Sequence, residues 1–280
     1  MKSPTLEEIL ASVDSLPSLP GIVNELIQAQ GREDVSVDDL VHGIAQDQAL
    51  TARVLRVANS PFYGMQHKVA SIHDAVVVLG LRAVSNLVLA ASMTGYFTPP
   101  PGYGFDPRGF WRHSFGTALA ARILAQHCRM DPETGFTAGL LHDIGRLMLM
   151  THHAEGYAQV VTTWEEGEAG LWNVERGLLG FDHAQAGELL ARRWRFPEAI
   201  AQAVARHHTP AEGQARTFAD VIHLADVLAH ALELGGDGLD RVYPIDAGVW
   251  RRLGLDGPAL DTLLPEIGRA HAGCDALFTA

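Results

Sequence analysis

The sequence predicts an all-α protein, a two-lobed helical bundle, on three observations. Apolar residues return every three or four positions along most of the chain, which is the period of a helix packed on one face. The two-residue alternation of a half-buried strand is nearly absent. Helix caps stand where such helices would begin, as at Asp106-Pro107 and Asp131-Pro132, where a capping carboxylate precedes a first-turn proline.

Composition sets limits on the partners. The 280 residues are 47% hydrophobic and 19% charged, which suffices for a large core and excludes a disordered chain or a coiled coil. The 21 Lys and Arg against 33 Asp and Glu give a net charge of −12. Because DNA and anionic lipid surfaces bind chiefly to basic faces, we expect neither as a partner.

Two features predict a reducing, cytoplasmic location. Cys128 and Cys274 are too few for a disulfide framework, and no signal peptide pattern opens the sequence. The most apolar stretch, Ala75 to Met93, is interrupted by Arg82 and by the polar pair Ser85-Asn86. We therefore expect a pair of core helices there and no membrane span.

The first lobe is expected over residues 1–103. Short amphipathic helices are predicted over Val37–Ile44 and Leu50–Ala58, and a turn follows at Asn59–Gly64. Ser71 can cap a helix that runs through Leu79, and Gly80 separates it from another that ends near residue 94. The segment Thr98–Gly104, with three prolines and two glycines, then marks the boundary.

The second lobe is expected over residues 104–235 and a helical tail over 236–280. Asp106-Pro107 should open a helix to about His127, and Asp131-Pro132 one that carries Leu140 to Met150. The remaining predictions are helices that start at Asp182 and at Pro197, one over Gln214–Leu234, and short pieces over Ala247–Leu253 and Pro258–Ile267.

Ionisable side chains recur within the apolar helices of the second lobe. They are His113, His142, Asp143, His183, His207, His208 and Asp226. A buried carboxylate such as Asp143 is costly unless a cation faces it, and a metal ion is the simplest one. Imidazole with carboxylate suits iron, manganese, zinc or nickel. Taken singly, each residue has a structural alternative: His142-Asp143 as a hydrogen-bonded pair, and Asp226 as a partner of Arg216 or His230.

The order of these residues resembles the HD phosphohydrolase superfamily, in particular the branch with the HD-GYP cyclic-dinucleotide phosphodiesterases. Several further segments resemble the HDOD domain, an HD-related output domain of bacterial signalling proteins. They are Leu16–Pro20, Ala58–Gly64, Ile72–Leu81, Trp111–Ser114, Gly139–Gly145, Gly180–Ala184 and Ala225–Ala229. The resemblance covers roughly residues 12 to 232.

The resemblance implies a signalling platform with one or two divalent metal ions. One ion would be held by His113, His142, Asp143 and Asp226, and the second by Asp143, His183, His207 and His208, with Asp143 bridging. The alternative is a metal-dependent phosphohydrolase or cyclic-dinucleotide phosphodiesterase, in which two ions assist displacement at phosphorus.

Two departures favour signalling over turnover. Arg146 stands where the hydrolases have lysine in His-Asp-x-x-Lys, and no Gly-Tyr-Pro segment follows His207-His208. If the protein is an enzyme, Asp143 and Arg146 are the catalytic candidates. We expect signalling proteins as partners, with a nucleotide or cyclic dinucleotide as the candidate small ligand.

Overall fold

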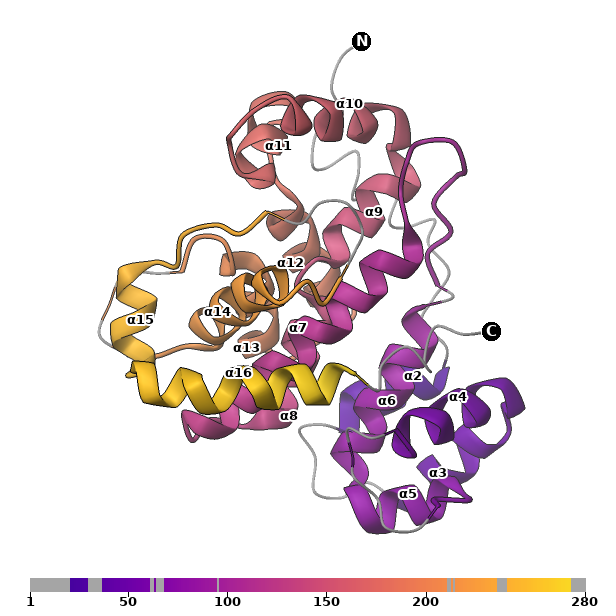
Figure 1. Cartoon of the computed structure of the whole chain (residues 1–280). Coiled ribbons are helices and arrows are strands. Elements are labelled where there is room, and N and C mark those ends of the chain that lie inside the picture. The colour runs from indigo at the N-terminus through magenta and orange to yellow at the C-terminus, as the bar shows by residue number, and fades with distance from the viewer. Residues whose placement is uncertain are drawn as a thin grey trace.

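The computed structural model describes residues 21–29, 37–60, 63, 68–94, 96–210, 213, 215–235 and 241–272. Every regular element within these ranges is an α-helix, which confirms the predicted all-α class (Figure 1). None of the helices in the described ranges has the length and apolar character needed to cross a membrane.

The first part of the chain forms a compact group of helices. They are α2 (Gly21–Ala29), α3 (Val37–Ala45), α4 (Gln48–Ala58), α5 (Ile72–Leu79) and α6 (Leu81–Met93), drawn in indigo to purple in Figure 1. Ser71 caps α5 by accepting from the Asp74 backbone N–H, as predicted. The side chain of Asn59 holds together the two ends of the turn that follows α4. Its amide nitrogen donates to the carbonyl oxygens of Leu55 and Val69, and its Oδ1 accepts from the Val69 backbone N–H. Part of this turn and the Leu16–Pro20 segment lie outside the described residues.

The long helix α7 is the centre of the second part, and α8, α14 and α16 pack against it (Figure 1). The remaining helices are α7 (Pro107–His127), α8 (Pro132–Leu141), α9 (Ile144–His152), α10 (Ala154–Glu165), α11 (Leu171–Leu179), α12 (His183–Arg193), α13 (Glu198–Arg206), α14 (Phe218–Ala231), α15 (Ala247–Leu253) and α16 (Gly257–His271). The predicted caps Asp106, Asp131 and Asp182 each accept from a backbone N–H of the first turn.

One predicted helix is wrong: the helix expected to carry Leu140 to Met150 is broken. The chain turns at His142 and Asp143, between α8 and α9. The apolar period continues across this turn because residues on both sides face the same core, so periodicity alone hides the break. The turn aims the two side chains inward. The helix expected from Gln214 begins later, at Phe218, where Thr217 caps it.

Glycines on either side of this turn allow neighbouring helices to approach it. A Cβ at Gly139 would lie 2.8 Å from the Ala118 Cα of α7, and a Cβ at Gly145 would overlap the His183 carbonyl oxygen of α12. No side chain larger than hydrogen fits at either position. The backbones of α7, α9 and α12 therefore meet around residues 142 and 143.

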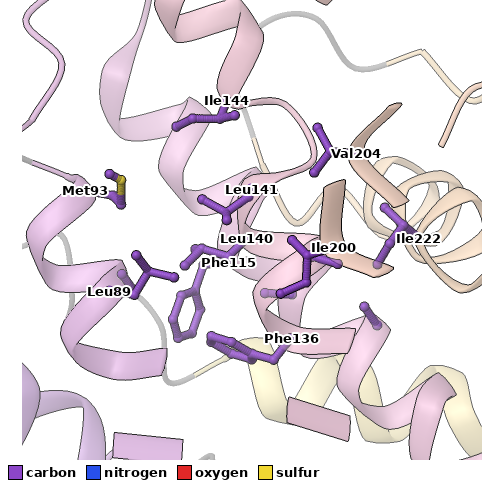
Figure 2. Packing of buried hydrophobic residues seen from close by; sticks show 14 of the residues in the cluster. Leu89, Met93, Phe115, Phe136, Leu140, Leu141, Ile144, Ile200, Val204 and Ile222 are labelled. Carbon is purple, nitrogen blue, oxygen red and sulfur yellow. The ribbon is translucent and has the colours of Figure 1, made fainter. Parts of the chain in front are cut away.

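The two parts share one apolar core. Figure 2 shows Leu89 and Met93 of α6 beside Phe115 and Leu140 of α7 and α8, and all four are buried. A bidentate pair between Arg82 and Asp131, with N–O distances of 2.9 and 2.6 Å, joins the same helices at the surface. The core thus continues across the linker near residue 103.

Candidate metal centre

The structure brings all seven predicted side chains to one place in the second part of the chain. They come from α7 (His113), the turn between α8 and α9 (His142, Asp143), the first residue of α12 (His183), the end of α13 (His207, His208) and α14 (Asp226). Six of the seven are buried, and only His208 is half-buried. Such a concentration of ionisable groups needs internal compensation.

Four of these residues form what we call the Asp143 group: Asp143, His183, His207 and His208. The Asp143 Oδ1 lies 3.2 Å from the His183 Nε2 and 3.6 Å from the His207 Nε2. The His183 and His208 Nε2 atoms are 2.9 Å apart. Bonds of about 2.1 Å to a common metal ion would place neighbouring ligand atoms about 3.0–3.4 Å apart. The observed spacings are close to this range.

A second set, the Asp226 group, consists of His113, Asp226 and His230. The Asp226 Oδ1 lies 3.1 Å from the His113 Nε2 and 3.3 Å from the His230 Nε2. His142 stands between the two groups, with its Nε2 3.4 Å from the Asp226 Oδ1 and 3.6 Å from the Asp143 Oδ2. His230, one of the two alternatives for Asp226, is its partner, whereas Arg216 donates to the Cys128 carbonyl.

The tautomers of two histidines follow from their backbone contacts. The Nδ1 atoms of His142 and His207 each lie 2.7 Å from a carbonyl oxygen three residues earlier, on Gly139 and Val204. A carbonyl only accepts, so both Nδ1 atoms carry the proton. When the rings are neutral, each aims the lone pair of its Nε2 into the cluster, where neither atom has a hydrogen-bond partner. This arrangement is typical of metal-binding histidines, so the residues present fit a metal ion. Burial opposes a charge on His142, but the carboxylates of Asp143 and Asp226 raise the pKa of this ring, so metal and proton compete for its Nε2.

A buried carboxylate stands behind His183. The Glu175 Oε2 accepts from the His183 Nδ1 at 2.6 Å and from its backbone N–H at 2.8 Å, and the Tyr157 hydroxyl donates to the other oxygen at 2.7 Å. Burial opposes a charge on the ring, but the carboxylates of Glu175 and Asp143 raise the pKa of His183 to about 10. A metal ion that binds the His183 Nε2 would therefore displace a proton from this ring.

Arg146 neutralises one side of Asp143. Its Nη1 donates to the Asp143 Oδ2 at 2.6 Å, and both side chains are buried. Burial raises the pKa of Asp143, but the neighbouring His142, Arg146 and His183 outweigh this effect and hold that pKa well below its usual range. The carboxylate is thus charged in the folded protein.

Sequence reasoning missed Glu175 and Trp172, and it named His230 only as a structural partner of Asp226. The Trp172 ring stacks on His208 with centroids 4.1 Å apart. His230 has a local signal, because it follows Asp226 by one helical turn on the same face. Glu175 and Trp172 have none, since α11 meets the cluster only through tertiary packing.

Comparison with known proteins places this architecture in a family. The model of the HDOD domain matches residues 16–210, so α14 with Asp226 lies beyond the matched part. An uncharacterized protein of Treponema pallidum (strain Nichols) is 26% identical over 198 residues, which are 70% of this chain and 38% of the relative. The chain thus spans well under half the length of that relative.

Two solved structures are similar over nearly all of this chain. The "Putative phosphohydrolase" of Shewanella amazonensis SB2B is 30% identical, with a TM-score of 0.78 and coverage of 96% of this chain and 97% of that one. The "Putative signal transduction protein" of Marinobacter aquaeolei VT8 is 26% identical, with a TM-score of 0.78 and coverage of 100% and 62%. From the family match over most of its length and this likeness of fold, the chain belongs to the HDOD domain family.

Proposed function

We propose that this chain is a cytoplasmic regulatory module of bacterial signalling that acts through contacts with other signalling proteins. Its cluster of histidines and aspartates holds one or two divalent transition-metal ions, of iron, manganese, zinc or nickel. The lobes are residues 1–103 and 104–235, followed by the tail 236–280. Membership of the HDOD family and the likeness to a protein named for signal transduction support the regulatory role.

One observation carries the metal proposal: the buried Nε2 atoms of His142 and His207 have no hydrogen-bond partner. Their Nδ1 protons are committed to backbone carbonyls, so in the neutral rings these nitrogens present only lone pairs. The His142 Nε2 lies 3.6 Å from the Asp143 Oδ2, and the His207 Nε2 lies 3.6 Å from the Asp143 Oδ1. Lone pairs facing a carboxylate repel unless a cation lies between them, and a divalent ion satisfies both sides.

The test is the metal content of the wild type after reconstitution with each of the four metals, against two variants. Asp143→Ala removes a proposed ligand. Asp74→Ala is the matched control, because His73-Asp74 is the same dipeptide at an exposed place in α5. We expect metal in the wild type and in Asp74→Ala, and loss of at least one ion in Asp143→Ala. A wild type that binds none of the metals would overturn the proposal.

A second function, a metal-dependent phosphohydrolase or cyclic-dinucleotide phosphodiesterase, is favoured by the complete ligand set and by the neighbour named for phosphohydrolysis. A bound ion would supply an activated water and Lewis acidity. Asp143 and Arg146 would be the residues nearest that chemistry.

The same samples decide between the two functions when they are screened with nucleotides and cyclic dinucleotides. Turnover that follows the metal content and disappears in Asp143→Ala establishes the enzyme. Metal without turnover supports the regulatory module.

A further inference from the structure

We propose that His230 is a metal ligand, and that His113, Asp226 and His230 hold an ion separate from the one held by the Asp143 group. This inference rests on the proposed function, since it takes for granted that the cluster binds metal. It changes the ligand set implied by the family resemblance in two respects. His230 takes the place at this ion that the resemblance assigns to Asp143, and His142, whose Nε2 lies 3.4 Å from the Asp226 Oδ1 and 3.6 Å from the Asp143 Oδ2, is shared between the two groups.

The contacts within the Asp226 group are those of a ligand set. The three candidate ligand atoms lie within 4.8 Å of one another. The His113 and His230 rings are stacked, with centroids 4.4 Å apart and planes at 27°, so both present an Nε2 to the same carboxylate oxygen. The distances of 3.1 and 3.3 Å to the Asp226 Oδ1 fall within the range of about 3.0–3.4 Å expected around a common ion.

Asp143 also lies within ligand distance of His113 and His142, since the candidate ligand atoms of these three residues are within 4.8 Å of one another, but Arg146 disfavours a bridging role for Asp143. The Asp143 Oδ1 faces His183 and His207 of its own group. The other oxygen, Oδ2, is bonded by the Arg146 guanidinium at 2.6 Å. A second cation at Oδ2 would have to displace this buried arginine or stand beside its positive charge, and both are costly. The Asp226 group therefore needs a donor from elsewhere, and His230 supplies it.

The position of His230 also suits a ligand. Asp226 and His230 are one turn apart on α14, a spacing that places two side chains on one face, as in helices that bind zinc. The side chain of His113 is wholly buried, whereas that of His230 is 11% exposed. His230 thus stands at the outer edge of the cluster, where an ion could enter. Three protein ligands would leave a coordination position for water or an oxygen donor.

The test is a titration of the metal-free protein with Co²⁺, followed by visible absorption and by the number of ions bound. The variants are His230→Gln and Asp143→Ala. His127→Ala, a change of an exposed histidine at the end of α7, is the control. We expect two ions in the wild type and in the control. His230→Gln should lose one ion or bind it at least about tenfold more weakly, and it should keep the spectrum of the Asp143 group. Asp143→Ala should keep the ion of the Asp226 group.

Other outcomes overturn this inference separately from the proposed function. If the wild type binds Co²⁺ and His230→Gln binds it with unchanged number, affinity and spectrum, His230 is not a ligand although the cluster binds metal. If Asp143→Ala loses every ion while circular dichroism shows it folded, Asp143 serves both ions and the groups are not separate. If the wild type binds no Co²⁺ or other metal, both proposals fail. Should His230→Gln not fold, His230→Asn with the same readouts replaces it.

Discussion

The two groups of the cluster differ in what stands behind their ligands. In the Asp143 group, the Glu175 carboxylate holds His183, the Trp172 ring stacks on His208, and Arg146 holds Asp143. In the Asp226 group, His113 and His230 stack on each other. Supporting hydrogen bonds fix ring orientation and raise ligand basicity. The Asp143 group is therefore the better organised half, and we expect it to bind metal more tightly.

The largest expected effect tests the ion pair at the centre of the Asp143 group. Asp143→Ala leaves the buried Arg146 guanidinium without its carboxylate, which should lower the free energy of unfolding of the metal-free protein by about 3–5 kcal/mol. Urea denaturation measures this change. The double variant Asp143→Ala/Arg146→Leu should recover most of the loss. A loss below about 1 kcal/mol would mean that the pair does not organise this half.

The next effect concerns the carboxylate behind His183. Glu175→Gln keeps the shape of the side chain but removes its charge, so metal affinity at the Asp143 group should fall about 10- to 100-fold. Affinity at the Asp226 group should not change. Competition titration with a chromogenic chelator measures both. Tyr157→Phe, which removes only a donor to Glu175, is the control and should have the smaller effect. Equal losses at the two groups would contradict the difference between them.

The pH dependence sharpens the same comparison. The pKa of His183 is raised to about 10, so the ring is protonated at neutral pH in the metal-free protein. Binding of an ion to the Asp143 group should release this proton, and affinity should rise about tenfold per pH unit between 7 and 9. Calorimetry in buffers of different ionisation enthalpy counts the protons.

The stability of the metal-free protein should change with pH in the opposite direction to its metal affinity. A raised pKa stabilises the metal-free fold fully below the unfolded value of about 6.5, and this contribution is lost as the pH rises through 10. Metal-free protein should therefore unfold at lower urea concentrations as the pH is raised over this interval. Binding without proton release would show that His183 is not charged.

The smallest effect concerns the aromatic support of His208. Trp172→Leu removes the stacked ring, a contact of about 0.5–1.5 kcal/mol, and should weaken metal binding at the Asp143 group by a few-fold. Isothermal titration measures this affinity, and Trp250→Leu on α15, a helix that packs against α14, serves as the control. An unchanged affinity would leave Glu175 and Arg146 as the supports of this group.

Much of the fold could be predicted from local signals. Helix starts at Asp106, Asp131 and Asp182 were predicted from caps, because a capping side chain acts on its own first turn. The break in the helix at His142-Asp143 was not predicted, because residues on both sides of the turn keep the apolar period. The seven candidate ligands were found through their residue types and order. Glu175 was missed, since nothing in the sequence near it indicates which helix it will face.

The sequence by itself determined the helical class, most helix boundaries and the kind of ligand in the cluster, because periodicity, capping and side-chain chemistry are local properties. Tertiary structure alone decided that Arg146 occupies the Asp143 Oδ2, that Glu175 stands behind His183 and that Trp172 stacks on His208. These contacts depend on how closely helices distant in sequence approach one another. That approach is set by the packing of the whole core, down to the absence of a side chain at residue 145.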